Sequence, residues 1–231
     1  MRVKKFFADY KTITTDDIAP GRDGASKLAE CFYFCLKNAK FLENRLAATF
    51  DYIEPDGANY GAYSQTSREI ILQACIQIEV LAKNLLDVFC LEGEGKAGFP
   101  KLKPKDSVWK KLFTLCSQKS KDILYGAIGV DFVPYKNKAP RKCDGNFSFV
   151  PWKLNEGLLM PDWWIIYNGI KHDGGNDLAQ FTYMTAVKSL GGLYAFIAFA
   201  KSTAGAGRLA YDPSFVSEYF EILPRKYNFW N

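Results

Sequence analysis

The stretch EIILQACIQIEVLAKNLLDV, Glu69 to Val88, repeats apolar side chains with the period of an α-helix. Side chains three and four positions apart share one face of a helix. The residues on that face are Ile70, Ile71, Ala74, Ile78, Leu81, Ala82, Leu85 and Val88. The pattern predicts a long helix from about Ala62 to Leu91, with Thr66 and Glu69 as a capping box at its start.

A second helical pattern precedes this one, from Ala25 to about Tyr52. Apolar side chains recur there at helical spacing, and the polar residues 43–45 interrupt them. The segment EPDGANYG, residues 54–61, separates the two patterns and contains the proline and glycine that break helices. A short connection between two long helices predicts an antiparallel hairpin.

Two further helices are predicted in the second half of the chain, Asp162 to Lys171 and Leu178 to about Lys201. Pro161 suits the first turn of the former, and Asp177 with Gln180 resembles a cap of the latter. The fold class is therefore expected to be all-α. Four main helices in two hairpins would form a helical bundle, with residues 1–231 as a single domain.

Positive charge gathers between the two hairpins, in residues 92–160. We expect an irregular basic insertion there, with one short helix from Asp106 to about Ser117. Lys96 to Lys142 contains 12 Lys/Arg against 3 Asp/Glu, whereas the remaining residues sum to −4. Such a basic segment is typical of proteins that bind polyanions, and a solvated lysine-rich loop explains it equally well.

The six cysteines show no C-x-x-C pair and no histidine near them in sequence, so we expect neither a metal nor another cofactor. They lie among apolar residues, as free buried thiols do, which favours a reducing, cytoplasmic location. The most apolar run, LGGLYAFIAFA from Leu190 to Ala200, is too short to span a bilayer. It predicts a buried helix, and no membrane association is expected.

The segment DWWIIYNGIKHDGGND, Asp162 to Asp177, contains His172, the single histidine of the chain. On a helix its side chains fall into two stripes. The stripe expected to face a shallow site or a partner consists of Trp164, Asn168, Lys171 and His172. The neighbouring stripe, expected to face inward, consists of Trp163, Tyr167 and Ile170. An imidazole beside an amide and an ammonium suits acid–base chemistry on a phosphate ester, and helix capping with core packing is the alternative.

The residues WWIIYNGIKHD, followed by a glycine-rich turn and a long apolar helix, resemble the HEPN superfamily, and in particular divergent bacterial members with a W-x-x-YN-x-x-KH motif. The resemblance is strong over Trp163 to Asp173. Over 25–91 and 178–201 it rests on helix order alone. It implies a HEPN-like helical bundle that dimerises. Many members are metal-independent endoribonucleases of toxin–antitoxin and antiviral defence systems.

Carried onto this chain, the polar motif residue matches Asn168 and the catalytic histidine matches His172. The family arginine falls on Tyr167, whose phenol lacks the permanent forked positive charge of a guanidinium. Lys171 or Arg141 would have to replace that charge. If neither does, the chain is a catalytically inactive HEPN-like module for dimerisation or protein interaction.

The resemblance therefore implies a protein that binds or cleaves RNA, acting as a homodimer or with a partner protein of a defence or antitoxin system. The expected catalytic residues are His172, Asn168 and Lys171. The expected RNA-binding residues are Lys110, Lys111, Lys138, Arg141 and Lys142. Aromatic residues interleaved with these cations suit either single-stranded RNA or ordinary packing. They are Trp109, Tyr135, Phe149 and Trp152. Glu79, in the middle of an apolar helix, is expected to pair with Lys83.

Overall fold

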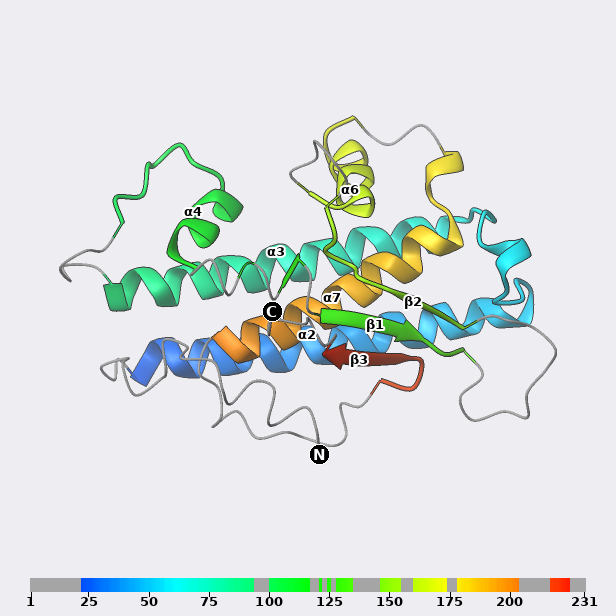
Figure 1. The fold of residues 1–231 in the computed structure, drawn as a ribbon, viewed down its shortest axis with the longest axis horizontal. Coiled ribbons are helices and arrows are strands. Elements are labelled where there is room, and N and C mark those ends of the chain that lie inside the picture. The colour runs from blue at the N-terminus through cyan, green and yellow to red at the C-terminus, as the bar shows by residue number, and fades with distance from the viewer. Residues whose placement is uncertain are drawn as a thin grey trace, which may run out of the picture.

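A computed structural model describes residues 22–93, 100–116, 121, 124–125, 128–134, 146–154, 160–173, 178–203 and 217–224. Three long helices run along the molecule, with shorter helices beside them and a small sheet (Figure 1). The helices are α2 (Arg22–Ala48), α3 (Gln65–Gly93), α4 (Val108–Leu115), α6 (Asp162–Asp173) and α7 (Tyr183–Thr203). The strands are β1 (Ile128–Phe132), β2 (Phe147–Phe149) and β3 (Phe220–Pro224). Three short 3-10 turns are Thr49–Asp51, Gly57–Asn59 and Leu178–Gln180.

The hairpin of α2 and α3 confirms the two helices expected in the first third of the chain. Their apolar faces are buried against each other, including every residue named from the 70–88 pattern. The predicted capping box is wrong, because the first turn of α3 is capped one residue before Gln65. The Ser64 hydroxyl accepts a hydrogen bond from the backbone N–H of Ser67 at 3.0 Å. Glu69 instead forms an ion pair with Arg45 of α2.

Helix α7 packs against both α2 and α3. By length and composition, Tyr183–Ala200 is apolar enough to cross a membrane, but 83% of that stretch is buried inside the protein. The buried residues of α7 include Thr185, Leu193, Phe196 and Ile197, and Phe181 just before it is buried as well. The helix begins later than predicted because Thr182 caps it, accepting a hydrogen bond from the Thr185 N–H at 3.1 Å. Asp177, the predicted cap, lies outside the described residues.

The described part of the chain is mostly helical, as expected, but it is not all-α, because three strands form an antiparallel sheet in the order β2-β1-β3. The sheet joins segments that are far apart in sequence: Val130 lies opposite Phe149 on one side and Ile222 on the other. Val130 and Phe132 are fully buried. Val130 and Phe149 lie close to Gly191, the first residue of the glycine pair Gly191–Gly192 in α7. The predicted insertion is therefore not wholly irregular, since β1 and β2 lie within it.

Helix α4 is the short helix expected in the insertion, and it packs against α3. Ser107 caps it by accepting a hydrogen bond from the Lys110 N–H at 3.2 Å. Figure 1 shows α4 and α6 on the same side of α3, away from the sheet. Helix α4, which carries Lys110 and Lys111, and helix α6, which carries the motif with His172, thus both pack on α3. Strands β1 and β3 pack on α7 instead.

Candidate functional site

Helix α6 buries more of its surface than the sequence pattern indicated. Trp163, Tyr167 and Ile170 point inward as expected, with exposures of 1%, 1% and 6%. The prediction that Trp164 faces a site or a partner is wrong, because this side chain is 2% exposed. The helix packs against both α3 and α7, so two adjacent stripes are covered rather than one.

The two tryptophans of α6 belong to an aromatic cluster that joins α4, α6 and α7. Trp109 of α4 meets the ring of Trp164 edge-on, with 5.0 Å between centroids, and Trp152 meets Trp163 at 5.2 Å. The Trp163 indole N–H donates to the Pro151 carbonyl at 2.7 Å, and that of Trp152 donates to the Gly192 carbonyl at 3.0 Å. The aromatic residues of the basic insertion were expected either to stack on RNA bases or to pack in the protein. Trp109 and Trp152 pack in the protein. Tyr135 lies outside the described residues.

Lys171 is held in an internal ion pair at the end of α6. Its Nζ lies 2.9 Å from both carboxylate oxygens of Glu79 on α3, and 5.5 Å from the centre of the Tyr167 ring. The expectation that Glu79 pairs with Lys83 is therefore wrong. The ion pair spans two helices, which a pattern within one helix does not reveal. Its side chains are 43% and 35% exposed, so solvent screens the attraction.

The position expected to hold the family arginine is filled by a neutral group. Burial, and after it the nearby Glu79 carboxylate, raises the pKa of the Tyr167 phenol well above its usual value. The phenol therefore stays protonated at physiological pH and offers no positive charge to a phosphate. Lys171, the cation that the described part of the chain places beside the phenol, is bound by the same carboxylate.

Asn168 and His172 lie one turn apart on α6, the former half-buried and the latter exposed. Among the residues that the structure describes, neither side chain has a hydrogen-bond partner. Among the described residues, no neighbouring side chain orients the His172 imidazole toward a substrate. The three expected catalytic residues thus share one end of α6 without forming a hydrogen-bonded constellation.

Two of the expected RNA-binding residues are described, and both stabilise the start of α4. Lys110 pairs with Asp106 at 2.9 Å, and the Lys111 ammonium donates to the Pro104 carbonyl at 3.0 Å. Lys110 remains largely exposed, with 64% of its side chain accessible. Lys138, Arg141 and Lys142 lie outside the described residues.

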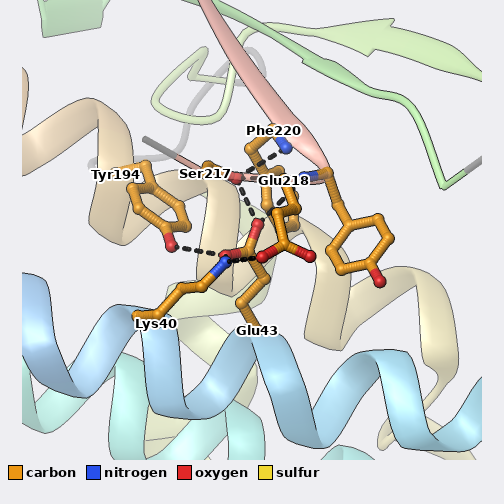
Figure 2. Close-up of polar contacts among 7 residues, drawn as sticks. Lys40, Glu43, Tyr194, Ser217, Glu218 and Phe220 are labelled. Atoms are coloured by element: carbon orange, nitrogen blue, oxygen red, sulfur yellow. Dashed lines mark hydrogen bonds and ion pairs between the residues drawn. The ribbon is translucent and has the colours of Figure 1, made fainter. Parts of the chain in front are cut away.

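A polar cluster that sequence reasoning missed surrounds Glu43 of α2, which is fully buried (Figure 2). Each carboxylate oxygen meets two donors. Oε1 accepts from the Ser217 hydroxyl and from the Tyr219 N–H at 3.0 Å. Oε2 accepts from the Tyr194 hydroxyl at 3.2 Å and lies 3.1 Å from Lys40 Nζ. The only signal in the sequence was a charged residue on the apolar stripe of a helix.

We call the Glu43 cluster the Glu43 clasp, because its hydrogen bonds hold α2, α7 and residues 217–220 together. The Ser217 oxygen donates to the carboxylate and accepts from the backbone N–H of Phe220 at 2.7 Å, so the hydroxyl is fixed in place. Burial, and then Glu43, raises the pKa of the Tyr194 phenol, which therefore remains a donor. Burial opposes the charge of Lys40, but hydrogen bonds to Glu218 and Glu43 outweigh it and raise its pKa. Both carboxylate oxygens of Glu43 are therefore satisfied within the cluster.

The cysteines of the described segments are free thiols, namely Cys31, Cys35, Cys75, Cys90 and Cys116. Burial raises the pKa of the Cys75 and Cys116 thiols, which makes them poor nucleophiles. Within the same segments, no group of three or more His, Cys, Asp or Glu side chains is arranged to hold a metal ion.

The outer surface of the α2–α3 hairpin carries apolar side chains and a shallow hollow of about 280 Å³. Phe34, Phe41, Ile76 and Val80 are 51%, 59%, 38% and 44% exposed. The hollow is lined by Asn38, Phe41, Leu42, Arg45, Glu69, Gln73 and Gln77. Phe41 is one of the residues that line the hollow, and exposed apolar side chains are found on surfaces that contact another macromolecule.

Compared with protein-family models, with curated proteins and with solved structures, the chain gives no match in any of the three comparisons.

Proposed function

We propose that this chain is a HEPN-like helical protein of the cytoplasm that binds RNA without cutting it. The observation that carries this proposal is the Lys171–Glu79 ion pair beside the buried Tyr167. Cleavage by attack of a 2′-hydroxyl develops negative charge on the phosphate, which needs a positive group in position. At the end of α6 the phenol is neutral and the ammonium is already paired.

Binding to RNA is supported by the lysines that precede and begin α4. Residues 100–116 contain five lysines and a single acidic residue, Asp106. Four of these lysines are exposed. Phosphate neutralisation by such side chains provides most of the affinity in sequence-independent binding. A role in bacterial defence or in a toxin–antitoxin system, as a homodimer or with a partner protein, belongs to the same proposal.

The second candidate function is a protein-interaction module without RNA. It is favoured by the exposed side chains of Phe34, Phe41, Ile76 and Val80 on the α2–α3 hairpin. Apolar contacts of this kind bind another protein or a second copy of the chain, whereas they offer little to a phosphate backbone.

Incubation of the full chain with total RNA in the presence of EDTA tests the proposal, with His172→Ala measured in parallel. We expect both proteins to shift the RNA in a gel and to leave its length unchanged. Cleavage by the wild type that is lost in His172→Ala would show that the chain is a metal-independent endoribonuclease. If neither protein binds RNA, the RNA proposal is wrong and the interaction module remains.

A further inference from the structure

Three lysines in the loop before α4 are exposed and have no acidic partner among the described residues: Lys101, Lys103 and Lys105. We propose that this lysine loop, residues 101–105, is a binding site for the phosphate backbone of RNA. The inference rests on the proposed RNA-binding function and assigns it to residues other than those the sequence pattern singled out.

The backbone of the lysine loop is held in place on both sides. Leu102 packs against the hydrophobic core between two exposed lysines, so Lys101 and Lys103 point away from it. Pro104 follows Lys103 at the second position of a turn, which the Asp106 N–H closes by donating to the Lys103 carbonyl at 3.0 Å. The Lys111 ammonium donates to the Pro104 carbonyl at 3.0 Å. A fixed backbone reduces the conformational entropy lost when a ligand binds.

No acidic side chain among the described residues pairs with Lys101, Lys103 or Lys105. Asp106, the nearest acidic residue in sequence, is engaged by Lys110 at 2.9 Å. The side chains of Lys101 and Lys103 begin about 6.6 Å apart if the backbone is extended, and they flank the inward Leu102. Each ammonium can therefore meet a different phosphate of one strand.

RNA fits this surface better than an anionic membrane or an acidic protein does. A membrane-binding loop needs an apolar or aromatic side chain to insert, and Leu102 is turned inward. Trp109, the nearest large aromatic residue in sequence among those described, has its ring packed against Trp152, Trp164 and Phe196. Among the described residues beside the loop, no exposed ring is placed to stack on bases, so contacts of the lysines with the phosphate backbone carry the binding. Binding should then be independent of base sequence and strongly dependent on salt.

The test replaces all three lysines by glutamine and measures binding of a fluorescein-labelled single-stranded RNA of mixed sequence by fluorescence anisotropy. The matched control replaces three other exposed lysines, Lys37, Lys83 and Lys153, which lie outside the loop and have no ion pair among the described residues. Both variants lose the same net charge. Thermal unfolding of each variant shows that the fold is retained.

We expect the loop variant to bind on the order of 100-fold more weakly at ~0.1 M salt. The slope of log affinity against log salt should fall by about 2, as expected for three lost phosphate contacts on a single strand. The control should bind within a few fold of the wild type. Equal weakening of both variants would overturn the inference, because net charge rather than the loop would then explain binding.

Two further outcomes separate this inference from the proposed function. If the wild type binds RNA and the loop variant binds it equally well, the function stands and the assignment to the lysine loop is wrong. If the wild type binds no RNA, both fail. Vesicles of phosphatidylcholine with phosphatidylserine are assayed beside RNA, and loop-dependent binding to these alone would replace RNA by a lipid surface.

Discussion

At the scale of single residues, Glu43 carries the largest number of long-range polar contacts described above. Its carboxylate joins α2 to Tyr194 of α7 and to Ser217 and Tyr219 before β3. Removing an ionised carboxylate from water is costly unless donors replace the lost hydration. Four donors replace that hydration here. They come from α2, from α7 and from the segment before β3, so the carboxylate is fully stabilised only when these three parts of the chain are folded together.

Glu43→Gln should lower the free energy of unfolding by about 2–3 kcal/mol. The amide nitrogen would replace one acceptor and face donors that then have no partner. The control is Glu218→Gln, which loses the same charge opposite the same Lys40 but at a side chain that is 53% exposed. It should cost less than ~1 kcal/mol. Urea unfolding followed by circular dichroism measures both, and equal losses would contradict a special role for Glu43.

The motif residues of α6 show which side-chain positions and partners the sequence could predict and which it could not. Helical spacing correctly placed Trp163, Tyr167 and Ile170 on one buried stripe. It did not reveal that Trp164 is buried too, because the extent of burial depends on how many neighbouring elements cover the helix. Nor did it reveal that the partner of Lys171 lies on α3, at Glu79.

At the scale of elements, the long helices were predictable from the sequence, whereas the pairing of the strands was not. A helix such as α3 repeats its apolar pattern over many turns, so the signal accumulates within one segment. β2 has three residues, and β1 finds its partner β3 only across α6 and α7. The pairing that stabilises these strands is not present in any local window. The Ser64 and Thr182 caps were not predicted either, because several polar residues near the start of each helix could act as its N-cap.

The glycine pair of α7 allows two other elements to approach closely. A Cβ at Gly192 would lie 2.6 Å from the Trp163 ring of α6, and one at Gly191 would lie 2.5 Å from Phe149 of β2. These contacts are shorter than rigid rings tolerate. The pair therefore fixes how α6 and the sheet pack on α7.

Gly192→Ala should destabilise the protein by about 1–3 kcal/mol through overpacking, even though alanine is the better helix former. Gly169→Ala on α6 is the matched change, because nothing lies within 4 Å of its added Cβ. It should stabilise the protein by roughly 0.5–1 kcal/mol. Thermal unfolding compares the two. A stabilising Gly192→Ala would show that Trp163 can move away.

At the scale of the whole molecule, burial of phenols and thiols sets the stability at high pH. Burial raises the pKa of Tyr125 to about 12 and that of Cys116 to about 12. Both groups stay protonated in the folded protein where the unfolded chain has ionised. The unfolded state then binds fewer protons, so the free energy of unfolding falls as pH rises.

The stability due to these groups should be fully present below pH ~9 and decline up to about pH 12. Melting temperatures measured between pH 8 and 11 check this expectation. Tyr125→Phe should reduce the decline relative to its own value at pH 8, since it removes one ionising phenol. An unchanged pH profile in this variant would show that Tyr125 does not contribute.

The Glu43 clasp also has a consequence for the order in which the protein is made. Glu43 and the Tyr219 N–H that it accepts are separated by 176 positions. When a ribosome has delivered α2, α3 and α7, two of the four donors to that carboxylate have not yet been translated. Helix α2 must therefore keep the Glu43 carboxyl group in contact with water, in the middle of its apolar stripe, until residues 217–219 emerge. Completion of the core is thereby delayed until residues 217–219 have been synthesised.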